Sequence, residues 1–151
     1  MVLIYMLLAF LGGIFLALQV GVNAQLRIWS GHSIYAMFIS ILISSSTGAL
    51  VLLLYTFTSN LPGLSLERLF QAPVWIWTGG TLGALYVWFA ILLAPRLEAT
   101  VFLGLIVTGQ LITSLTIDHY GLLGFPHHPI NLWRTVGVVL LISGVILIRR
   151  F

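Results

Sequence analysis

The segment TVFLGLIVTGQLITSLTIDH, Thr100 to His119, is long and apolar enough to cross a lipid bilayer as a single helix. A transmembrane helix needs about 20 apolar residues, because each adds about 1.5 Å of rise to a hydrocarbon core about 30 Å thick. Gln110 lies at the middle of this segment, where a carboxamide without a hydrogen-bond partner is unfavourable. The segment therefore predicts a membrane-spanning helix with a polar group that needs a partner inside the protein.

The rest of the chain has the same apolar character. Of its 151 residues, 60% are hydrophobic and 6% are charged, against roughly 25% charged residues in a soluble domain. The basic residues are all arginines dispersed between apolar blocks, whereas a nucleic-acid-binding protein needs a clustered basic face. Because the chain has no cysteine, disulfides and thiolate metal sites are excluded.

Five apolar blocks predict an all-α integral membrane protein with one transmembrane domain, residues 1–151. The expected helices are residues 2–22, 34–57, 74–94, 99–117 and 132–148. The segments between them are rich in Gly, Pro, Ser and Asn, which interrupt helices. The first block follows no basic segment and is too long for a signal peptide, so we expect it to remain in the membrane.

The distribution of arginine predicts an orientation in the membrane. One side carries Arg68 and Arg134, and the other carries Arg27, Arg96, Arg149 and Arg150. The positive-inside rule therefore places the N-terminus outside and the C-terminus inside. Because the bias is small, insertion in both orientations stays open.

Polar side chains within the expected helices are the candidates for a binding site. Gln19 and Asn23 are four residues apart and share one helix face, and Gln110 lies in the middle of the fourth span. One interpretation is that these side chains hydrogen-bond helix to helix, each contributing about 1 kcal/mol. The other is that they line a central polar cavity that binds substrate, with Tyr86 and Trp88 as aromatic walls.

Small residues recur at helical spacing and predict close helix packing. They are Gly13, Ala17 and Gly21 in the first block, Gly79 and Gly83 in the third, and Gly137 and Gly144 in the last. We expect the first two rows to pack within the chain and the last to form a groove for a second subunit. The hydroxyls of Ser40 and of Ser44 to Thr47 are expected to hydrogen-bond from helix to helix, and they can also bond to the carbonyls one turn back.

The acidic residues lie at the ends of the spans. The sequence therefore offers no buried carboxylate for which substrate and proton could compete. Asp118 and His119 could relay protons at the membrane surface, or could bond to one another and to the end of their helix. His127 and His128 lack carboxylate or cysteine partners, so we expect no metal site. No phosphate-binding loop or hydrolase motif is present, and we expect neither an enzyme nor a cofactor.

Three stretches carry a resemblance to a known family. They are LQVGVNAQL from Leu18, WIWTGGTLGALYV from Trp75, and APRLEATVFLGLIVTGQLITSLTIDHYGLLG from Ala94. Their order and spacing resemble the YdcZ-type half-size proteins of the drug/metabolite transporter superfamily. The terminal GVVLLISGV is similar to the dimerising last helix of small multidrug resistance proteins, a shorter branch of that superfamily.

The resemblance implies that the chain is half of a ten-helix drug/metabolite transporter fold. It would pair with an inverted copy, as an antiparallel homodimer of dual topology, or with a paralogue. The resemblance also implies a multi-pass exporter of small molecules in the bacterial inner membrane, with Gln19, Asn23 and Gln110 matching the family's polar motif. The first-helix glutamate of the small multidrug resistance proteins is absent, so proton coupling by that route is not implied.

We therefore expect a dimeric transporter whose helices rock on glycine-lined contacts between inward-open and outward-open states. A channel lined by the same amides is one alternative. A non-transporting membrane subunit of a paralogue's complex is the other. The expected partners are the lipid bilayer, a small-molecule substrate and a second subunit, with no nucleic acid.

Overall fold

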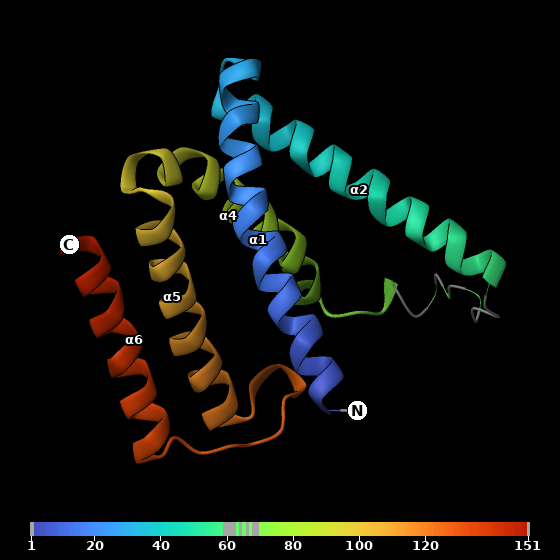
Figure 1. Ribbon diagram of the computed structural model, residues 1–151. Coiled ribbons are helices and arrows are strands. Elements are labelled where there is room, and N and C mark those ends of the chain that lie inside the picture. Colours follow the sequence, from blue (N-terminus) through green and yellow to red (C-terminus); the bar gives the residue numbers. More distant parts are fainter. Residues whose placement is uncertain (1, 59–62, 64, 66, 68–69, 151) are drawn as a thin grey trace. The chain divides into compact units, whose positions relative to one another are not determined.

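The computed structural model describes residues 2–58, 63, 65, 67 and 70–150, and over these residues it contains helices and no strand (Figure 1). The elements are α1 (Val2–Ser30), α2 (Ser33–Thr58), the short 3-10 helix η1 (Val74–Trp77), α4 (Thr78–Leu97), α5 (Ala99–Tyr120), the 3-10 turn η2 (Leu122–Gly124) and α6 (Leu132–Arg150). Five of the described segments are long and apolar enough to cross a membrane, which confirms the prediction of five spans. Arg68, used above for the orientation, lies outside the described residues.

The contacts of the chain divide it into two compact units, Met1–Leu92 and Leu93–Phe151, and each is described by itself. The first contains α1, α2 and most of α4. The second contains the end of α4 together with α5 and α6. The prediction of one transmembrane domain stays a prediction.

Gly31 ends α1 and turns the chain into α2. Its φ of +79° lies in the left-handed region that glycine adopts without strain. The Gly31 N–H donates to the carbonyl of Arg27 at 3.0 Å, and the Ile34 N–H donates to Nδ1 of His32 at 3.2 Å. The first helix continues to Ser30, beyond its predicted end at residue 22, because Gly21 remains helical and the chain first leaves the helix at Gly31.

The contact between α1 and α2 is confined to the neighbourhood of this turn. The buried residues of α1 are Val20 and Asn23, and those of α2 are Ser33, Ala36 and Ser40. All five lie in the half of their helix that is nearer the turn. Small and polar side chains therefore form this contact, while the far ends of both helices present apolar side chains to their surroundings.

The hydroxyl run of α2 bonds to its own helix. The side-chain oxygens of Ser44, Ser46 and Thr47 each donate at 2.9 Å to the carbonyl four residues earlier. Of the two arrangements that the sequence offered, these three hydroxyls therefore take the local one. Because they are satisfied locally, they do not require a neighbouring helix.

Pro95 lies inside α4, which the sequence predicted to end at residue 94. Proline has no N–H, so the carbonyl of Ile91, four residues earlier, loses its helical hydrogen bond. Arg27 at the end of α1 donates from Nη1 to this carbonyl at 3.5 Å. Ile91 is fully buried, and a buried carbonyl is stable only with a partner. The bond from Arg27 replaces the one that Pro95 removes, and α4 continues to Leu97.

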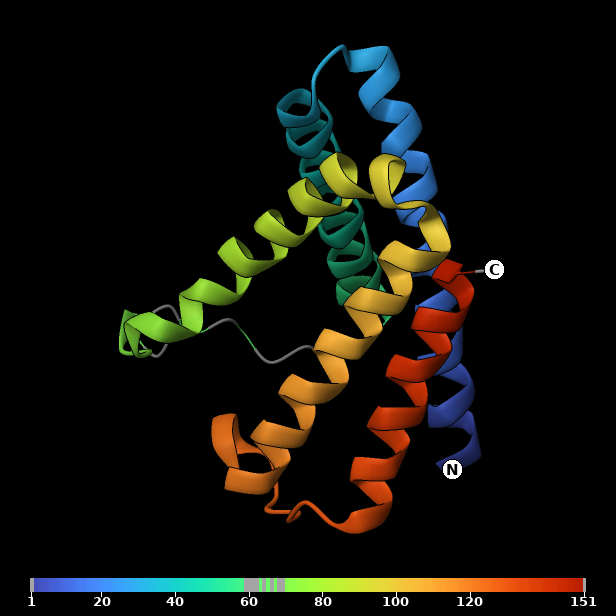
Figure 2. The same ribbon diagram turned by 90° about the vertical axis from the view of Figure 1, so that its left-hand side faces the viewer.

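The helices α5 and α6 lie side by side and antiparallel in both views (Figures 1 and 2). They approach closely at Gly104, where an added Cβ atom would lie 2.7 Å from Cγ2 of Val145. Thr100, Gly104 and Thr108 form a row of small residues four apart on α5. The hydroxyl of Thr108 donates to the Gly104 carbonyl at 2.8 Å, so the contact contains no unpaired hydroxyl at this position.

The glycine rows predicted for helix packing are uncovered in the described part of the chain. Outside its own helix, no described residue comes within 4 Å of a Cβ atom placed at Gly13, Gly21, Gly79, Gly83, Gly137 or Gly144. Ala17 is exposed as well. A packing role for these rows stays a prediction, and Gly104 is the glycine at which two helices meet.

Candidate functional site

Asn23 is the most deeply buried of the three predicted carboxamides. It is 5% exposed on α1, and Gln19, one turn earlier on the same face, is half-buried. Neither side chain hydrogen-bonds to another described residue. Within a membrane span a carboxamide is favourable only with a polar partner, so this face of α1 is suited to bind water, a substrate or a second subunit.

The helix α4 contributes two more unpaired polar atoms to the first unit. Tyr86 Oη and Trp88 Nε1 are buried, and no described residue bonds to either. Buried tyrosine and tryptophan usually find a hydrogen-bond partner for these atoms. The sequence singled out both residues as aromatic walls of a cavity, and the structure shows that each also holds a free donor inside the span.

Gln110 belongs to the second unit, on α5. Its side chain is exposed and forms no hydrogen bond with a described residue. Its predicted convergence with Gln19 and Asn23, which belong to the first unit, stays a prediction. The unpaired polar groups that the structure brings into one unit are those of α1 and α4.

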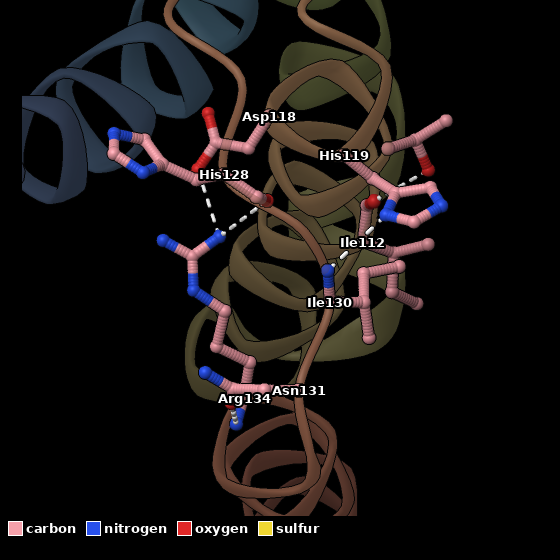
Figure 3. Close-up of polar contacts among 8 residues, drawn as sticks. Ile112, Asp118, His119, His128, Ile130, Asn131 and Arg134 are labelled. Carbon is pink, nitrogen blue, oxygen red and sulfur yellow. Dashed lines mark hydrogen bonds and ion pairs between the residues drawn. The ribbon is translucent and has the colours of Figure 1, made fainter.

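The connection between α5 and α6 carries a network of polar contacts (Figure 3). Asp118 Oδ2 forms an ion pair with Arg134 Nη1 at 3.3 Å, and the same nitrogen donates to the carbonyl of His128 at 3.2 Å. The His128 N–H donates in turn to the carbonyl of Asp118 at 2.8 Å. These bonds join the end of α5, the connecting segment and the first turn of α6.

His119 bonds to a different part of this connection from Asp118 (Figure 3). Its Nδ1 accepts a hydrogen bond from the Ile130 N–H at 3.2 Å. A nitrogen that accepts carries no proton, so the proton of the neutral ring is on Nε2. The alternative in which Asp118 and His119 bond to one another is therefore not the arrangement observed, and a proton relay through them stays a prediction.

Two helix caps complete the connection. Gly121 follows α5 at a φ of +60°, and its N–H donates to the Asp118 carbonyl at 3.4 Å. Asn131 precedes α6, and its Oδ1 accepts from the Arg134 N–H at 2.9 Å, which is an N-cap bond. The sequence analysis missed both caps, although a glycine after His119 and an asparagine before an apolar block are the signals for them.

An apolar groove lies between α5 and α6. It has a volume of about 390 Å³ and is lined in part by Gly104, Leu141, Gly144 and Val145. Gly144 is one of the two glycines predicted to receive a second subunit. The groove has no charged lining residue, so it suits an apolar side chain of another helix better than a polar substrate.

Comparison with known proteins identifies one family model that covers almost all of the chain. The model described as "Putative inner membrane exporter, YdcZ" matches residues 4–147. No curated protein and no solved structure matches the chain. The matched range includes every residue that the sequence analysis assigned to substrate binding.

Proposed function

Since this chain belongs to the YdcZ-type family of inner membrane exporters, we propose that it carries a small molecule across that membrane by alternating access, as a dimer. The family and the five apolar helices place the chain in the inner membrane. The proposal includes no catalytic step and no cofactor.

The unpaired polar groups of the first unit are the observation that supports a substrate site. Gln19 and Asn23 on α1, with Tyr86 and Trp88 on α4, hold neutral donors and acceptors within their spans that no described side chain satisfies. In a bundle with a purely structural role, such groups would bond to one another, because the hydrocarbon core offers them no hydrogen-bond partner. A transporter leaves them for a solute that binds and departs.

The chemistry of these side chains defines a class of solute. Carboxamides, a phenol and an indole donate and accept hydrogen bonds without carrying charge. The aromatic rings add apolar contact surface. We therefore assign the site to a small polar or amphipathic molecule, and we retain Gln110 of α5 as a further candidate for binding that molecule.

A dimer would complete the fold. A chain of five spans is half of the ten-helix transporter architecture, and an inverted copy or a paralogue would supply the other half. The uncovered rows at Gly13, Ala17 and Gly21 and at Gly137 and Gly144 offer surfaces on which a second subunit could approach closely. These surfaces support the proposal of a dimer.

Transport by variants tests the site. A ligand is first identified by thermal shift of the purified protein, because a molecule that binds the native state raises its stability. Its uptake is then measured in liposomes containing wild type, Asn23→Leu or Gln110→Leu. We expect each variant to lose most of the transport, at least about tenfold, because a leucine of similar size removes the hydrogen bonds.

Gln25→Leu is the matched control, since Gln25 lies on the same helix as Asn23 but is exposed. It should transport at the wild-type rate. If folded Asn23→Leu and Gln110→Leu also transport normally, the substrate site lies elsewhere. A flux that does not saturate with solute concentration would identify a pore, and transport that requires a co-expressed paralogue would identify a heterodimer.

A further inference from the structure

A second cavity in this chain lies where α4 ends and α5 begins. It has a volume of about 250 Å³ and is lined by Arg96, Leu97, Glu98, Val101 and Arg149, all of which belong to the second unit. Its lining therefore combines two guanidinium groups from different helices with one carboxylate. It shares no residue with the proposed substrate site or with the polar network at the opposite end of α5.

The three charged side chains of this cavity are available to a ligand. The side chains of Arg96, Arg149 and Glu98 form no ion pair or hydrogen bond with another described residue. This distinguishes them from Arg27 and Arg134, whose guanidinium groups hold a carbonyl and a carboxylate. Two unpaired arginines from separate helices that line one cavity form a site of positive potential.

The backbone at the edge of the cavity adds to this potential. Glu98 precedes α5 with a φ of +66°, a conformation that residues other than glycine rarely adopt. Its side chain does not cap the helix, so the N–H groups of the first turn of α5 lack the usual acceptor. These groups carry partial positive charge and favour an anion nearby.

We propose that this cavity binds a phosphate group, through Arg96 and Arg149. The planar guanidinium group donates two parallel hydrogen bonds to phosphate oxygens, which makes arginine the preferred residue for such an anion. With one carboxylate opposing two guanidinium groups, the lining has a net charge of +1, which matches the single negative charge of a phosphodiester. The volume suffices for such a group with several waters, since one water occupies about 30 Å³.

The position of the cavity favours a phospholipid headgroup as the source of this phosphate. Arg96 lies in the last turn of α4, Glu98 directly precedes α5, and Arg149 lies in the last turn of α6, so all three lie at the end of a membrane span. Basic pockets between helices at a membrane surface bind anionic headgroups. A phosphate-bearing solute would offer the same chemistry, and the experiment below separates the two.

The test uses the full-length protein in a neutral detergent and measures binding by thermal shift. The probes are short-chain phosphatidylglycerol, a diacylglycerol with the same acyl chains and no phosphate, and inorganic phosphate. We expect phosphatidylglycerol to raise the melting temperature and the diacylglycerol to leave it unchanged. Arg96→Gln and Arg149→Gln should each weaken phosphatidylglycerol binding about tenfold, because each removes one charged hydrogen-bonding group.

Two further variants distinguish specific binding in the cavity from nonspecific electrostatic attraction of the anionic lipid to a basic surface. Arg150→Gln removes the same charge from the neighbouring position of α6, which does not line the cavity, and should weaken binding less than about twofold because it removes only a long-range attraction that salt screens. Glu98→Gln should strengthen binding, because it removes the carboxylate that repels phosphate. This gain cannot arise from misfolding, and circular dichroism checks the fold of every variant.

The outcomes are distinct. Phosphatidylglycerol binding that inorganic phosphate does not displace at millimolar concentration identifies the lipid headgroup as the ligand. Displacement by inorganic phosphate identifies a site for a free phosphate group. Equal effects of Arg150→Gln and Arg149→Gln, or equal shifts with the diacylglycerol and phosphatidylglycerol, would overturn the proposal. Neither result depends on whether the protein transports a solute.

Discussion

The α1–α2 hairpin and the α5–α6 hairpin consist of similar apolar helices but are held together differently. The first has a two-residue turn at Gly31 and buries small and polar residues close to that turn. The second has a longer connection, with an ion pair and two caps, and its helices meet again at Gly104 and Val145. Both ends of the α5–α6 contact are therefore defined within the chain, whereas α1 and α2 are joined at one end.

This difference agrees with the proposed function. Along α1, no described residue covers the row that begins at Gly13, whereas Asn23 is buried close to the turn. The firmly held pair α5–α6 carries the apolar groove and the cavity at Arg96. A transporter that works by rocking needs some helices that change neighbours and others that keep them.

The largest effect is expected from Gly104→Ala. The new Cβ atom would lie 2.7 Å from Val145, whose branched side chain has few alternative rotamers, so the helices must separate. We expect a loss of about 2 kcal/mol in the free energy of unfolding, measured by reversible denaturation in detergent. The double variant Gly104→Ala with Val145→Ala should recover most of it.

Gly109→Ala is the control for this variant. Gly109 lies on the same helix, and a Cβ atom placed there meets nothing within 4 Å outside that helix. The substitution should be neutral or slightly stabilising, because alanine favours a helix over glycine. Equal losses for Gly104→Ala and Gly109→Ala would show that α5 and α6 are not packed at Gly104.

A smaller effect is expected from Arg27→Gln. This change shortens the side chain that reaches the carbonyl freed by Pro95, and leaves a buried acceptor unpaired. We expect a loss of about 1 kcal/mol in unfolding free energy. Pro95→Ala restores the missing N–H. In the Pro95→Ala variant, Arg27→Gln should therefore lower the free energy of unfolding much less than it does in the wild type. An unchanged cost in the double-mutant cycle would mean that Arg27 acts through other contacts.

The smallest effect is expected from Gly13→Ala, which mirrors Gly104→Ala on the other hairpin. No described residue outside α1 lies within 4 Å of the new methyl group, so the unfolding free energy of the monomer should change by less than about 0.5 kcal/mol. If a second subunit packs on this row, the same variant should weaken dimerisation measured by crosslinking or sedimentation. A large loss in the monomer would show that α1 is packed within the chain after all.

Several parts of this structure follow from local sequence. An apolar block of about 20 residues has few alternatives to a membrane helix, so the five spans were predictable. The bounds of two helices differed because a residue that often ends a helix remained helical, as Gly21 did, or because a tertiary contact compensated for such a residue, as at Pro95. The caps at Gly121 and Asn131 carried recognisable signals, and so did the row through Gly104, which has the same four-residue spacing as the row at Gly13.

The sequence by itself determined the membrane class, the five helices and the scarcity of polar groups within them, because each depends on the transfer of side chains and backbone into lipid. Only the tertiary structure decided which of the small residues a neighbouring helix packs against. It also decided that Arg27 bonds to a carbonyl 64 residues away, and that Arg96 and Arg149 line one cavity. Those facts depend on which helix faces which. Many glycines and arginines share the same local pattern, and only the partner across the contact distinguishes them.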